Sequence, residues 1–377
     1  MTSLKNLVFL TVPSILICIL FGELFFRFVI PAAEHPWGHY DPIDQIARFE
    51  IGQGAGMYTT GKYAQQRGRW RINNMGWNSD IDYLTSDRRS RPLIAIIGDS
   101  YIEALQVDIK NSIVSILREK VRDQYDVYGF GMSGASLAQY LQMSRYVNKY
   151  FSPNVLVINV VHNDFDESLT SIANYPYFLG IEITDSGPKE SVLPLIQIKA
   201  KRTTKIAFES AIFRYLWGNL EFNMRLLEWG FRQDENLAKQ KEEKNGYLYP
   251  EHVDNTKNIE EAVKYILLKM KEENPKSKLI FMIDAPRSDI YKNNIHHSKV
   301  LWMNKLLENL CTNYNILFID LTEPFYEKYK KDKIRFSSMT DYHWNEEGHR
   351  YASEVLYKNL LKFDMLGDGK LYQSRAR

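Results

Sequence analysis

The sequence predicts an α/β protein in which a doubly wound parallel sheet carries helices on both faces. Leu93–Ile97 is a continuous apolar run that ends in a glycine, the pattern of a strand buried on both sides. Val155–Val161 is a second such run, interrupted only by Asn159. From residue 93 onward the predicted strands and helices alternate, as they do when crossover helices join parallel strands.

The same patterns predict the remaining elements of the sheet and its helices. Strands are expected at 93–97, 127–131, 155–161, 278–283 and 316–319, and helices at 111–125, 137–150, 259–273, 298–314 and 346–361. Residues 166–255 interrupt the alternation. We expect them to form a helical insertion over one face of a main domain at 91–363, which a tail at 364–377 follows.

The N-terminal region predicts a membrane anchor. Residues 7–30 are almost wholly apolar, and at about 1.5 Å per residue they are long enough to cross a hydrocarbon core of roughly 30 Å. Glu23 and Arg27 interrupt the run four residues apart, so they can pair on one helix face. No small-residue cleavage site closes the run, which favours an uncleaved anchor over a signal peptide.

The charges ahead of the apolar run predict how the chain is oriented. Lys5 is the only charged side chain before it, so we expect residues 1–6 in the cytoplasm and the body of the protein outside. A loop-rich, membrane-proximal segment at 31–90, punctuated by glycines, then leads to the main domain. The sequence thus predicts a single-pass membrane protein with an extracytoplasmic catalytic domain.

Composition and charge exclude several classes of partner. The chain has 377 residues, 48 of them basic and 46 acidic, with a formal net charge of +2. This balance creates no general field for polyanions, so we expect no nucleic-acid partner. One cysteine, Cys18, lies inside the apolar run and the other is Cys311, so we expect no disulfide. His35 and His39 lack a clear third ligand, and we expect neither a metal site nor a cofactor.

Polar residues follow the predicted strands where each strand ends. Gly98-Asp99-Ser100 follows the first, Gly134 comes soon after the second, Asn163-Asp164 follows the third, and Asp341 with His343 precedes the last helix. In open parallel sheets the functional groups gather at these carboxyl ends. We therefore expect these side chains to form one site.

The residue types at these ends are those of nucleophilic catalysis by a serine. Ser100 is a poor nucleophile until a base accepts its proton, and His343 is the natural base near neutral pH. Asp341 lies two residues from His343 and can hold the imidazole in the required tautomer. The backbone N–H groups of Ser100 and Gly134 and the side-chain amide of Asn163 can donate to a tetrahedral oxyanion.

Two further carboxylates have supporting roles in this scheme. Asp99 directly precedes the nucleophile, and we expect it to accept hydrogen bonds from the backbone around that turn. Asp164 directly follows Asn163, and we expect it to order its own loop.

In type and order these residues resemble the SGNH hydrolase superfamily, the GDSL esterases and lipases. Gly98-Asp99-Ser100 is similar to its first block, Gly134 to the oxyanion glycine of the second, Asn163-Asp164 to the third, and Asp341 with His343 to the last. The resemblance covers about residues 93–363, with the insertion set aside. It implies a flavodoxin-like three-layer fold and an enzyme that acts on ester bonds.

Two positions depart from the family pattern. Valine and histidine precede Asn163 where a glycine is usual, which narrows the expected oxyanion pocket. Only Tyr342 separates Asp341 from His343, where the family usually has two residues. Two arrangements are therefore expected as alternatives: a full triad, and a serine–histidine dyad with Asp341 at its periphery.

The residues in and around two motifs resemble certain branches of the superfamily more than others. Residues 341–349 and 72–77 are similar to branches that modify surface polysaccharides and often carry one N-terminal membrane helix. This implies an acylated glycan or another ester as substrate, and polysaccharide-assembly proteins as partners. We therefore expect an ester hydrolase or O-acetyl transferase that acts through an acyl-Ser100 intermediate. The alternatives are an inactive protein of the same fold that binds or assembles glycan, and a lipid or thioester hydrolase at the membrane.

Overall fold

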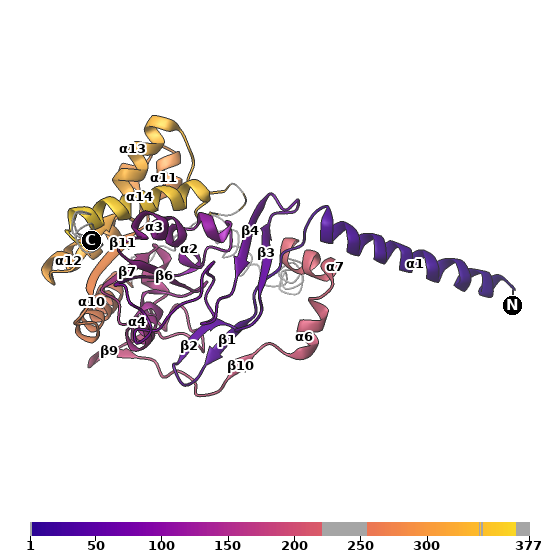
Figure 1. Ribbon diagram of the computed structural model, residues 1–377, viewed down its shortest axis with the longest axis horizontal. Helices are drawn as coiled ribbons and strands as arrows, with labels where there is room; N and C mark the ends of the chain where they lie inside the picture. The colour runs from indigo at the N-terminus through magenta and orange to yellow at the C-terminus, as the bar shows by residue number, and fades with distance from the viewer. Residues whose placement is uncertain (1, 221–254, 339, 341, 367–377) are drawn as a thin grey trace, which may run out of the picture. The chain divides into compact units, whose positions relative to one another are not determined.

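The computed structural model describes residues 2–220, 255–338, 340 and 342–366, which fall into two compact units (Figure 1). One unit lies within residues 1–35, 56–68 and 200–248, and the other within 36–55, 69–199 and 249–377. The second unit, which contains the large sheet, is called the catalytic unit below. The first contains the long N-terminal helix and is called the anchor unit.

The catalytic unit is built on a sheet of five parallel strands in the order β12-β11-β7-β5-β6. The strands are β5 (Leu93–Gly98), β6 (Asp126–Gly131), β7 (Val155–Val160), β11 (Lys278–Ile283) and β12 (Leu317–Asp320). Counted along the chain from one to five, this is the order 2-1-3-4-5 of flavodoxin-like folds. The predicted doubly wound α/β fold is therefore confirmed.

Helices cover both faces of this sheet, because β5, β7 and β11 are apolar on both faces apart from Asn159 of β7 and Lys278 at the start of β11. Ile94 and Ile96 of β5 pack with α3 and α14 on one face, whereas Leu93, Ala95 and Ile97 pack with α4, α10 and α12 on the other. The helices of this unit are α2 (Ser100–Glu103), α3 (Ile113–Val121), α4 (Leu137–Phe151), α5 (Asn163–Asp166), α10 (Thr256–Glu273), α11 (Arg287–Tyr291), α12 (Leu301–Asn313), α13 (Thr322–Asp332) and α14 (Glu346–Lys362).

The predicted core elements lie within a few residues of their expected positions, and the structure adds elements that the patterns did not mark. The described part of the expected insertion, 166–220, contains strands as well as helices. The added strands are β1 (Gly38–Asp41), β2 (Ile46–Phe49), β3 (Ala55–Thr60), β4 (Gln66–Arg71), β8 (Ile181–Thr184), β9 (Gly187–Glu190) and β10 (Ile198–Lys199). They are only two to six residues long, so no apolar run or alternation is long enough to distinguish them from loops. Helix α13 was also missed, since Phe325 is its only buried residue.

The anchor unit contains one helix that is long and apolar enough to cross a membrane. Helix α1 runs over Thr2–Phe28, and its stretch Val8–Phe28 has a mean hydropathy of 2.3. Most of its large apolar side chains are exposed, as lipid-facing side chains would be. The unit also contains α6 (Arg202–Ala207), α7 (Ala211–Arg214) and a short π-helix, η2 (Tyr215–Asn219).

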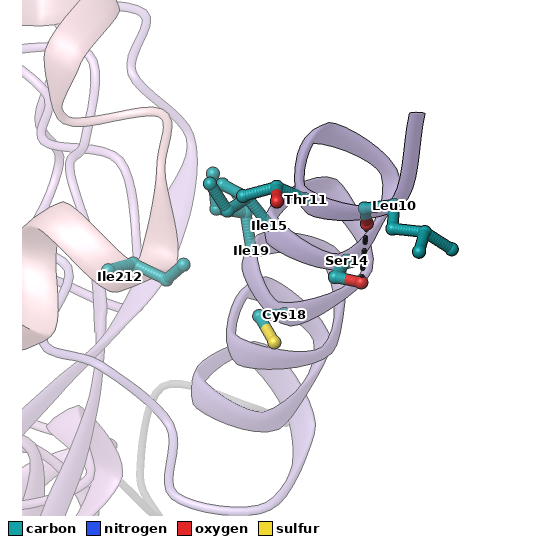
Figure 2. Close-up of a pocket in the computed structure, with 7 residues that line it drawn as sticks. All are labelled: Leu10, Thr11, Ser14, Ile15, Cys18, Ile19 and Ile212. Carbon is teal, nitrogen blue, oxygen red and sulfur yellow. Dashed lines mark hydrogen bonds between the residues drawn. The ribbon is translucent and has the colours of Figure 1, made fainter. Parts of the chain in front are cut away.

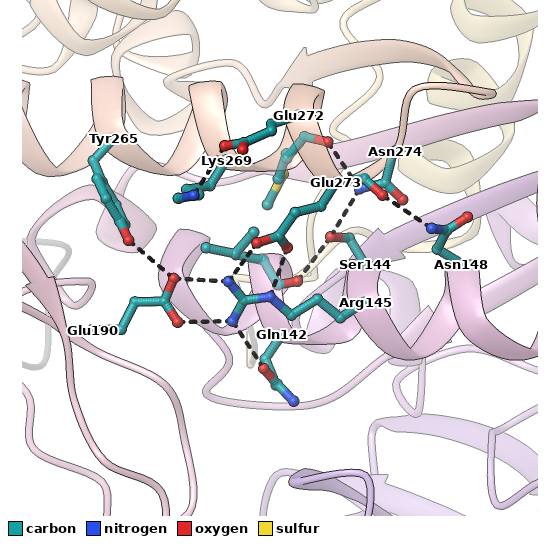
Figure 3. A network of polar contacts seen from close by, with 12 residues as sticks. Gln142, Ser144, Arg145, Asn148, Glu190, Tyr265, Lys269, Glu272, Glu273 and Asn274 are labelled. Carbon is teal, nitrogen blue, oxygen red and sulfur yellow. Dashed lines mark hydrogen bonds and ion pairs between the residues drawn. The ribbon is translucent and has the colours of Figure 1, made fainter.

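A cluster of ion pairs joins three elements of the catalytic unit (Figure 3). Arg145 of α4 binds Glu190 of β9 at 2.7 Å and Glu273 at the end of α10 at 2.7 Å. Each carboxylate receives two N–H donors of the guanidinium, and Tyr265 of α10 donates to Glu190 as well. The three charged side chains are only 25–29% exposed, so these bonds are well shielded from water. Arg145 thereby ties the β8–β9 hairpin to the helical layer.

We predict that Arg145→Ala lowers the free energy of unfolding by about 2 kcal/mol, because it leaves two half-buried carboxylates without their partner. The matched control is Lys149→Ala on the same helix, whose ion pair with Asp44 is more exposed on the lysine side. Thermal unfolding of the full chain in detergent, followed by circular dichroism, should show a clear fall in Tm for the first variant and a smaller one for the second. Equal falls would contradict the prediction.

The effect of Arg145→Ala should also depend on pH. The hydrogen bond from Arg145 is the main cause that lowers the pKa of Glu190 below its ordinary value of 4.5. A carboxylate with a lowered pKa contributes stability above pH 4.5 and loses it as the pH falls through the lowered value. The Tm difference between wild type and variant should therefore shrink as the buffer is made more acidic.

Candidate active site

The structure brings together the serine and the histidine that the sequence places 243 residues apart. Ser100 is the first residue of α2, directly after β5, and its Oγ lies 2.7 Å from Nε2 of His343. This is the hydrogen-bond distance that proton transfer from a nucleophile to its base requires. The pair lies at the carboxyl end of β5, where the strand order reverses between β5 and β7.

Asp99 shapes the turn that presents Ser100. Its carboxylate caps α2 by accepting from the N–H of Tyr101 at 2.9 Å, and the other oxygen lies 3.4 Å from Oγ of Ser100. Burial raises the pKa of Asp99 to about 6, although the Tyr101 N–H and the charge of His343 act in the opposite direction. Asp99 therefore supports the backbone of the turn that carries Ser100.

The loop after β6 brings Gly134 to the site in a conformation suited to glycine. Gly134 has a φ of +78°, in the left-handed region that side chains disfavour. In the described part of the chain, its N–H has no protein acceptor. This donor is therefore available to an oxyanion.

Glu103, at the end of α2, holds the loop that contains Gly134. It is buried, and its carboxylate accepts from the Ser133 N–H at 3.3 Å and from the Ser133 hydroxyl. Burial raises the pKa of Glu103 to about 7, against the lowering effect of both bonds from Ser133. The sequence analysis did not identify Glu103. Its only signal is its place one helical turn after Ser100, on the same helix face.

Asn163 occupies a different environment from the one its predicted role requires. It is an exposed residue at the start of α5, and its Nδ2 donates to Oε2 of Glu167 at 3.1 Å. This bond uses one of the two N–H donors of the amide, so the second N–H can still donate to an oxyanion. The oxyanion role of the Ser100, Gly134 and Asn163 donors stays a prediction, with one amide N–H of Asn163 bonded to Glu167.

Asp164 orders the loop after β7. It is fully buried, and one carboxylate oxygen accepts from the Val161 N–H at 2.8 Å and the Tyr140 hydroxyl at 2.9 Å. Burial, and then the charge of Asp99, raises its pKa well above the ordinary value. The residue before Asn163, His162, is also buried, and its Nε2 bonds to Oδ1 of Asn304 at 2.9 Å.

Asp341 lies outside the described residues, but the backbone on the other side of His343 is well anchored. Trp344 is fully buried, and its Nε1 donates to Oδ1 of Asp284 at 2.9 Å. Oδ2 of Asp284 forms an ion pair with Arg287 at 3.1 Å. This buried pair holds the segment that carries His343 against the end of β11.

Tyr101 links the same pair to the histidine. Arg287 donates to the Tyr101 hydroxyl, which in turn donates to the carbonyl of Tyr342 at 3.3 Å. The Tyr101 ring lies 5.1 Å from the imidazole of His343, measured between centroids. Asp284 follows β11 directly, and that position is the signal by which the sequence could have marked it. Its partners lie too far away in sequence to be predicted.

Comparison with known proteins identifies the domain that this geometry belongs to. Residues 94–190 match the family model of GDSL-like lipases/acylhydrolases. This part of the chain is a GDSL-like hydrolase domain. The match spans β5, β6 and β7, with Ser100, Gly134 and Asn163, and the predicted membership of the SGNH superfamily is confirmed. The match supports an SGNH-type esterase activity for this domain.

Similar solved structures include an acetyl xylan esterase, AlAXEase, at 15% identity and a TM-score of 0.40, covering 71% of this chain and 99% of that chain. A catalytic mutant of Axe2, an acetylxylan esterase from Geobacillus stearothermophilus, is 12% identical over 72% of this chain and 94% of that one, with a TM-score of 0.39. A member of the lipolytic G-D-S-L family from Veillonella parvula is 13% identical over 71% and 96%, with a TM-score of 0.36. No curated protein matches the chain.

The GDSL-like domain offers no evident metal centre in its described part. Among the described residues, no group of three or more His, Cys, Asp or Glu side chains is arranged to hold a metal ion. The carboxylates near Ser100 are instead bonded to backbone N–H groups, hydroxyls and a guanidinium.

We predict that Glu103→Ala lowers the kcat for p-nitrophenyl acetate about 10–100-fold, because the loop that presents the Gly134 N–H loses both bonds to Glu103. Glu103→Gln should retain most of the activity, since its carbonyl oxygen can still accept from Ser133. Ser133→Ala keeps the bond to the N–H and should fall between them. Thermal unfolding of each variant separates loss of activity from loss of fold. Full activity of a folded Glu103→Ala variant would contradict this role.

Proposed function

We propose that this esterase works through an acyl-Ser100 intermediate, with His343 as general base and general acid. The observation that carries the proposal is the 2.7 Å contact between Ser100 Oγ and His343 Nε2 at the switch point of the sheet. In the first step Oγ attacks the ester carbonyl carbon while His343 takes its proton. The carbonyl oxygen becomes an oxyanion and accepts from the N–H groups of Ser100 and Gly134.

The second half of the cycle uses the same residues in reverse. The tetrahedral intermediate collapses, and His343 donates its proton to the leaving alcohol oxygen, which leaves an acyl ester on Ser100. Water, or the hydroxyl of an acceptor sugar, then attacks this ester while His343 takes the proton. Collapse of the second intermediate returns the proton to Oγ and releases the acid or the acylated acceptor. Hydrolysis and transfer differ only in which hydroxyl enters at this step.

In this proposal Asp341 orients the imidazole of His343. Its position two residues before His343 supports this role, because a carboxylate on the same loop can accept from Nδ1. The Tyr101 ring, which lies beside His343 and packs edge-on against Trp344, supports the alternative, a dyad whose imidazole is held by its surroundings. Asn163 is proposed as a third oxyanion donor through the amide N–H that does not bond to Glu167.

We further propose that the substrate is an O-acetylated glycan. Aromatic side chains lie beside the oxyanion glycine: a Cβ on Gly134 would be 3.6 Å from the ring of Phe178, whose neighbours include Tyr175 and Tyr177. Tyr175 is 45% exposed and offers a face on which a sugar ring can stack. A small hollow beside these rings is lined largely by polar groups, among them Ser136, Glu167, Thr170, Asn174 and Ser191. Hydroxyl-bearing substrates suit such a surface better than long acyl chains do.

The proposed location is a single-pass membrane protein with its catalytic unit outside the cytoplasm. The apolar stretch Val8–Phe28 supports the span, and Lys5 on its N-terminal side supports the orientation. Exported glycans and polysaccharide-assembly proteins would then meet the enzyme on the same side of the membrane.

We predict that Ser100→Ala and His343→Gln each lower kcat/KM for p-nitrophenyl acetate by at least about 10³-fold, because each removes a participant in every step. Ser100→Ala should also abolish labelling by a fluorophosphonate probe. Ser186→Ala, at an exposed serine of the β8–β9 turn, is the matched control and should behave as wild type. Equal rates for wild type and Ser100→Ala would overturn the mechanism and favour a glycan-binding protein.

The same assay separates the proposed substrate from a lipid. With p-nitrophenyl esters from acetate to laurate, kcat/KM should fall as the acyl chain lengthens. Acetate release from an O-acetylated polysaccharide should require Ser100. A preference for laurate would instead favour lipid hydrolysis and contradict the glycan proposal, while leaving the role of Ser100 intact.

Asp341→Asn tests whether the site is a triad or a dyad. If Asp341 orients His343, the amide favours the wrong tautomer and kcat should fall by roughly 10⁴-fold. The fluorophosphonate labelling rate should fall with it, since both report the activation of Ser100. A loss below about 10-fold would contradict the triad and establish the dyad.

A further inference from the structure

Beyond the active site, the anchor unit contains a segment whose surface fits a lipid bilayer. We propose that residues 201–217, called the interfacial segment here, embed in the headgroup layer of the membrane that α1 is proposed to span. Its apolar and aromatic side chains would enter the boundary of the acyl chains, and its basic side chains would meet anionic headgroups. The inference rests on the proposed membrane placement of α1 and is independent of the esterase chemistry.

The interfacial segment is fastened to α1 inside the apolar stretch. Glu23 of α1 accepts from the Ser210 hydroxyl at 3.0 Å and from the N–H groups of Ala211 and Ile212 at 2.9 and 3.2 Å. Arg27, which pairs with Glu23, also donates to the carbonyl of Glu209 at 2.9 Å. These bonds explain how two charged residues are accommodated within an apolar helix, since buried charges need partners. They also fix the start of α7 against α1.

Apolar contacts place the interfacial segment beside α1, several residues before the helix ends at Phe28. The rings of Phe26 and Tyr215 stack at 3.9 Å, and a Cβ on Gly22 would lie 3.1 Å from Cδ1 of Ile212. Gly22 precedes the helix end at Phe28 by six residues, which is about 9 Å along the axis. Amphipathic segments at a membrane interface bury their apolar side roughly 5–10 Å deep. Ile212 therefore lies at the depth of an interfacial residue.

Figure 2 shows that Ile212 points toward the flank of α1. The hollow between them is lined by Ile212 and by Leu10, Thr11, Ser14, Ile15, Cys18 and Ile19. Most of these α1 side chains are exposed in the protein itself. In a bilayer, acyl chains would occupy this hollow, so the segment and the span would share one lipid environment.

The surface of the segment has the composition of an interfacial element. Ile206, Leu216 and Trp217 are 62%, 40% and 43% exposed. Trp217 stacks on Phe213 at 5.8 Å, and Phe208 packs against both rings. Lys201 and Arg202 are exposed at the start of the segment, and Lys205 follows one turn later. Exposed aliphatic and tryptophan side chains beside basic ones are typical of helices that lie on anionic membranes.

The bilayer is the occupant that the contacts favour. The exposed apolar side chains continue the surface of a helix that itself suits lipid, and hydrogen bonds at Glu23 and Arg27 keep the two together. A separate protein partner would have to bind within the headgroup layer to cover the same residues. The basic residues complement the negative surface of a membrane that contains anionic lipid.

The test is quenching of Trp217 by brominated lipid in nanodiscs that hold the full chain. The discs contain phosphatidylcholine and phosphatidylglycerol, with or without bromine near the headgroup end of the acyl chains. We expect the difference spectrum between wild type and Trp217→Phe to lose at least half of its intensity in brominated discs. The matched control is Trp302→Phe in the catalytic unit, whose difference spectrum should be unaffected.

The outcomes separate the two proposals. If the chain enters the discs but Trp217 emission is not quenched, the interfacial segment is refuted and the span stands. If the chain does not co-elute with the discs, the membrane placement fails and the inference fails with it. Exchanging phosphatidylglycerol for phosphatidylcholine should reduce the quenching in wild type. The double variant Lys201→Gln, Arg202→Gln should lose that lipid dependence, and a retained dependence would contradict the role of the basic residues.

Discussion

Helix α2 can lie on the ends of β5 and β6 only because residues 98 and 131 have no side chain. A Cβ on Gly131 would lie 1.9 Å from the backbone nitrogen of Glu103, and one on Gly98 would lie 2.4 Å from Ile102. The two glycines face each other across the β5–β6 register. This close approach puts Ser100 at the carboxyl end of β5 and Glu103 against the loop of Gly134. The positions of the nucleophile and of one oxyanion donor therefore depend on the same backbone contact.

Burial of carboxylates gives the site its electrostatic character. Asp99, Glu103 and Asp164 are each bonded to N–H or hydroxyl donors, yet burial raises the pKa of all three. Glu103, with a pKa of about 7, is only partly ionised near neutral pH. A partly neutral Glu103 repels a nearby oxyanion less than a fully ionised one would. Its hydrogen bonds to Ser133 remain in either form.

In each of the two units, a pair of oppositely charged side chains holds a segment from a distant part of the chain. In the catalytic unit, Asp284 and Arg287 hold the histidine segment through Trp344 and Tyr101. In the anchor unit, Glu23 and Arg27 hold the segment after residue 208 against α1. In both, an acid–base pair binds backbone or side-chain groups from a distant part of the chain. Such a pair fixes geometry even where it adds little net stability.

The strands of the central sheet and their helices could be predicted from the sequence because burial on both faces demands a continuous apolar run. Leu93–Ile97 and Lys278–Ile283 match the expected strands closely, and Asn345 caps α14 by accepting from the Gly348 N–H, as a polar residue ahead of two glutamates suggests. Local patterns of this kind depend only on near neighbours along the chain. They determined the fold class, the candidate nucleophile with its base, and the apolar N-terminal helix.

The tertiary structure decided what depends on partners far away in the chain. Two such contacts are the hydrogen bonds of Glu103 with Ser133 and of Asp284 with Trp344, which follow from how α2 and β11 pack. Glu23 is another example. In the sequence it only interrupts an apolar run, whereas in the structure its carboxylate accepts hydrogen bonds from Ser210 and Ala211. A single sequence records which side chains can donate or accept. Only the packed chain decides which of them meet, because each such contact is made across elements that the sequence keeps apart.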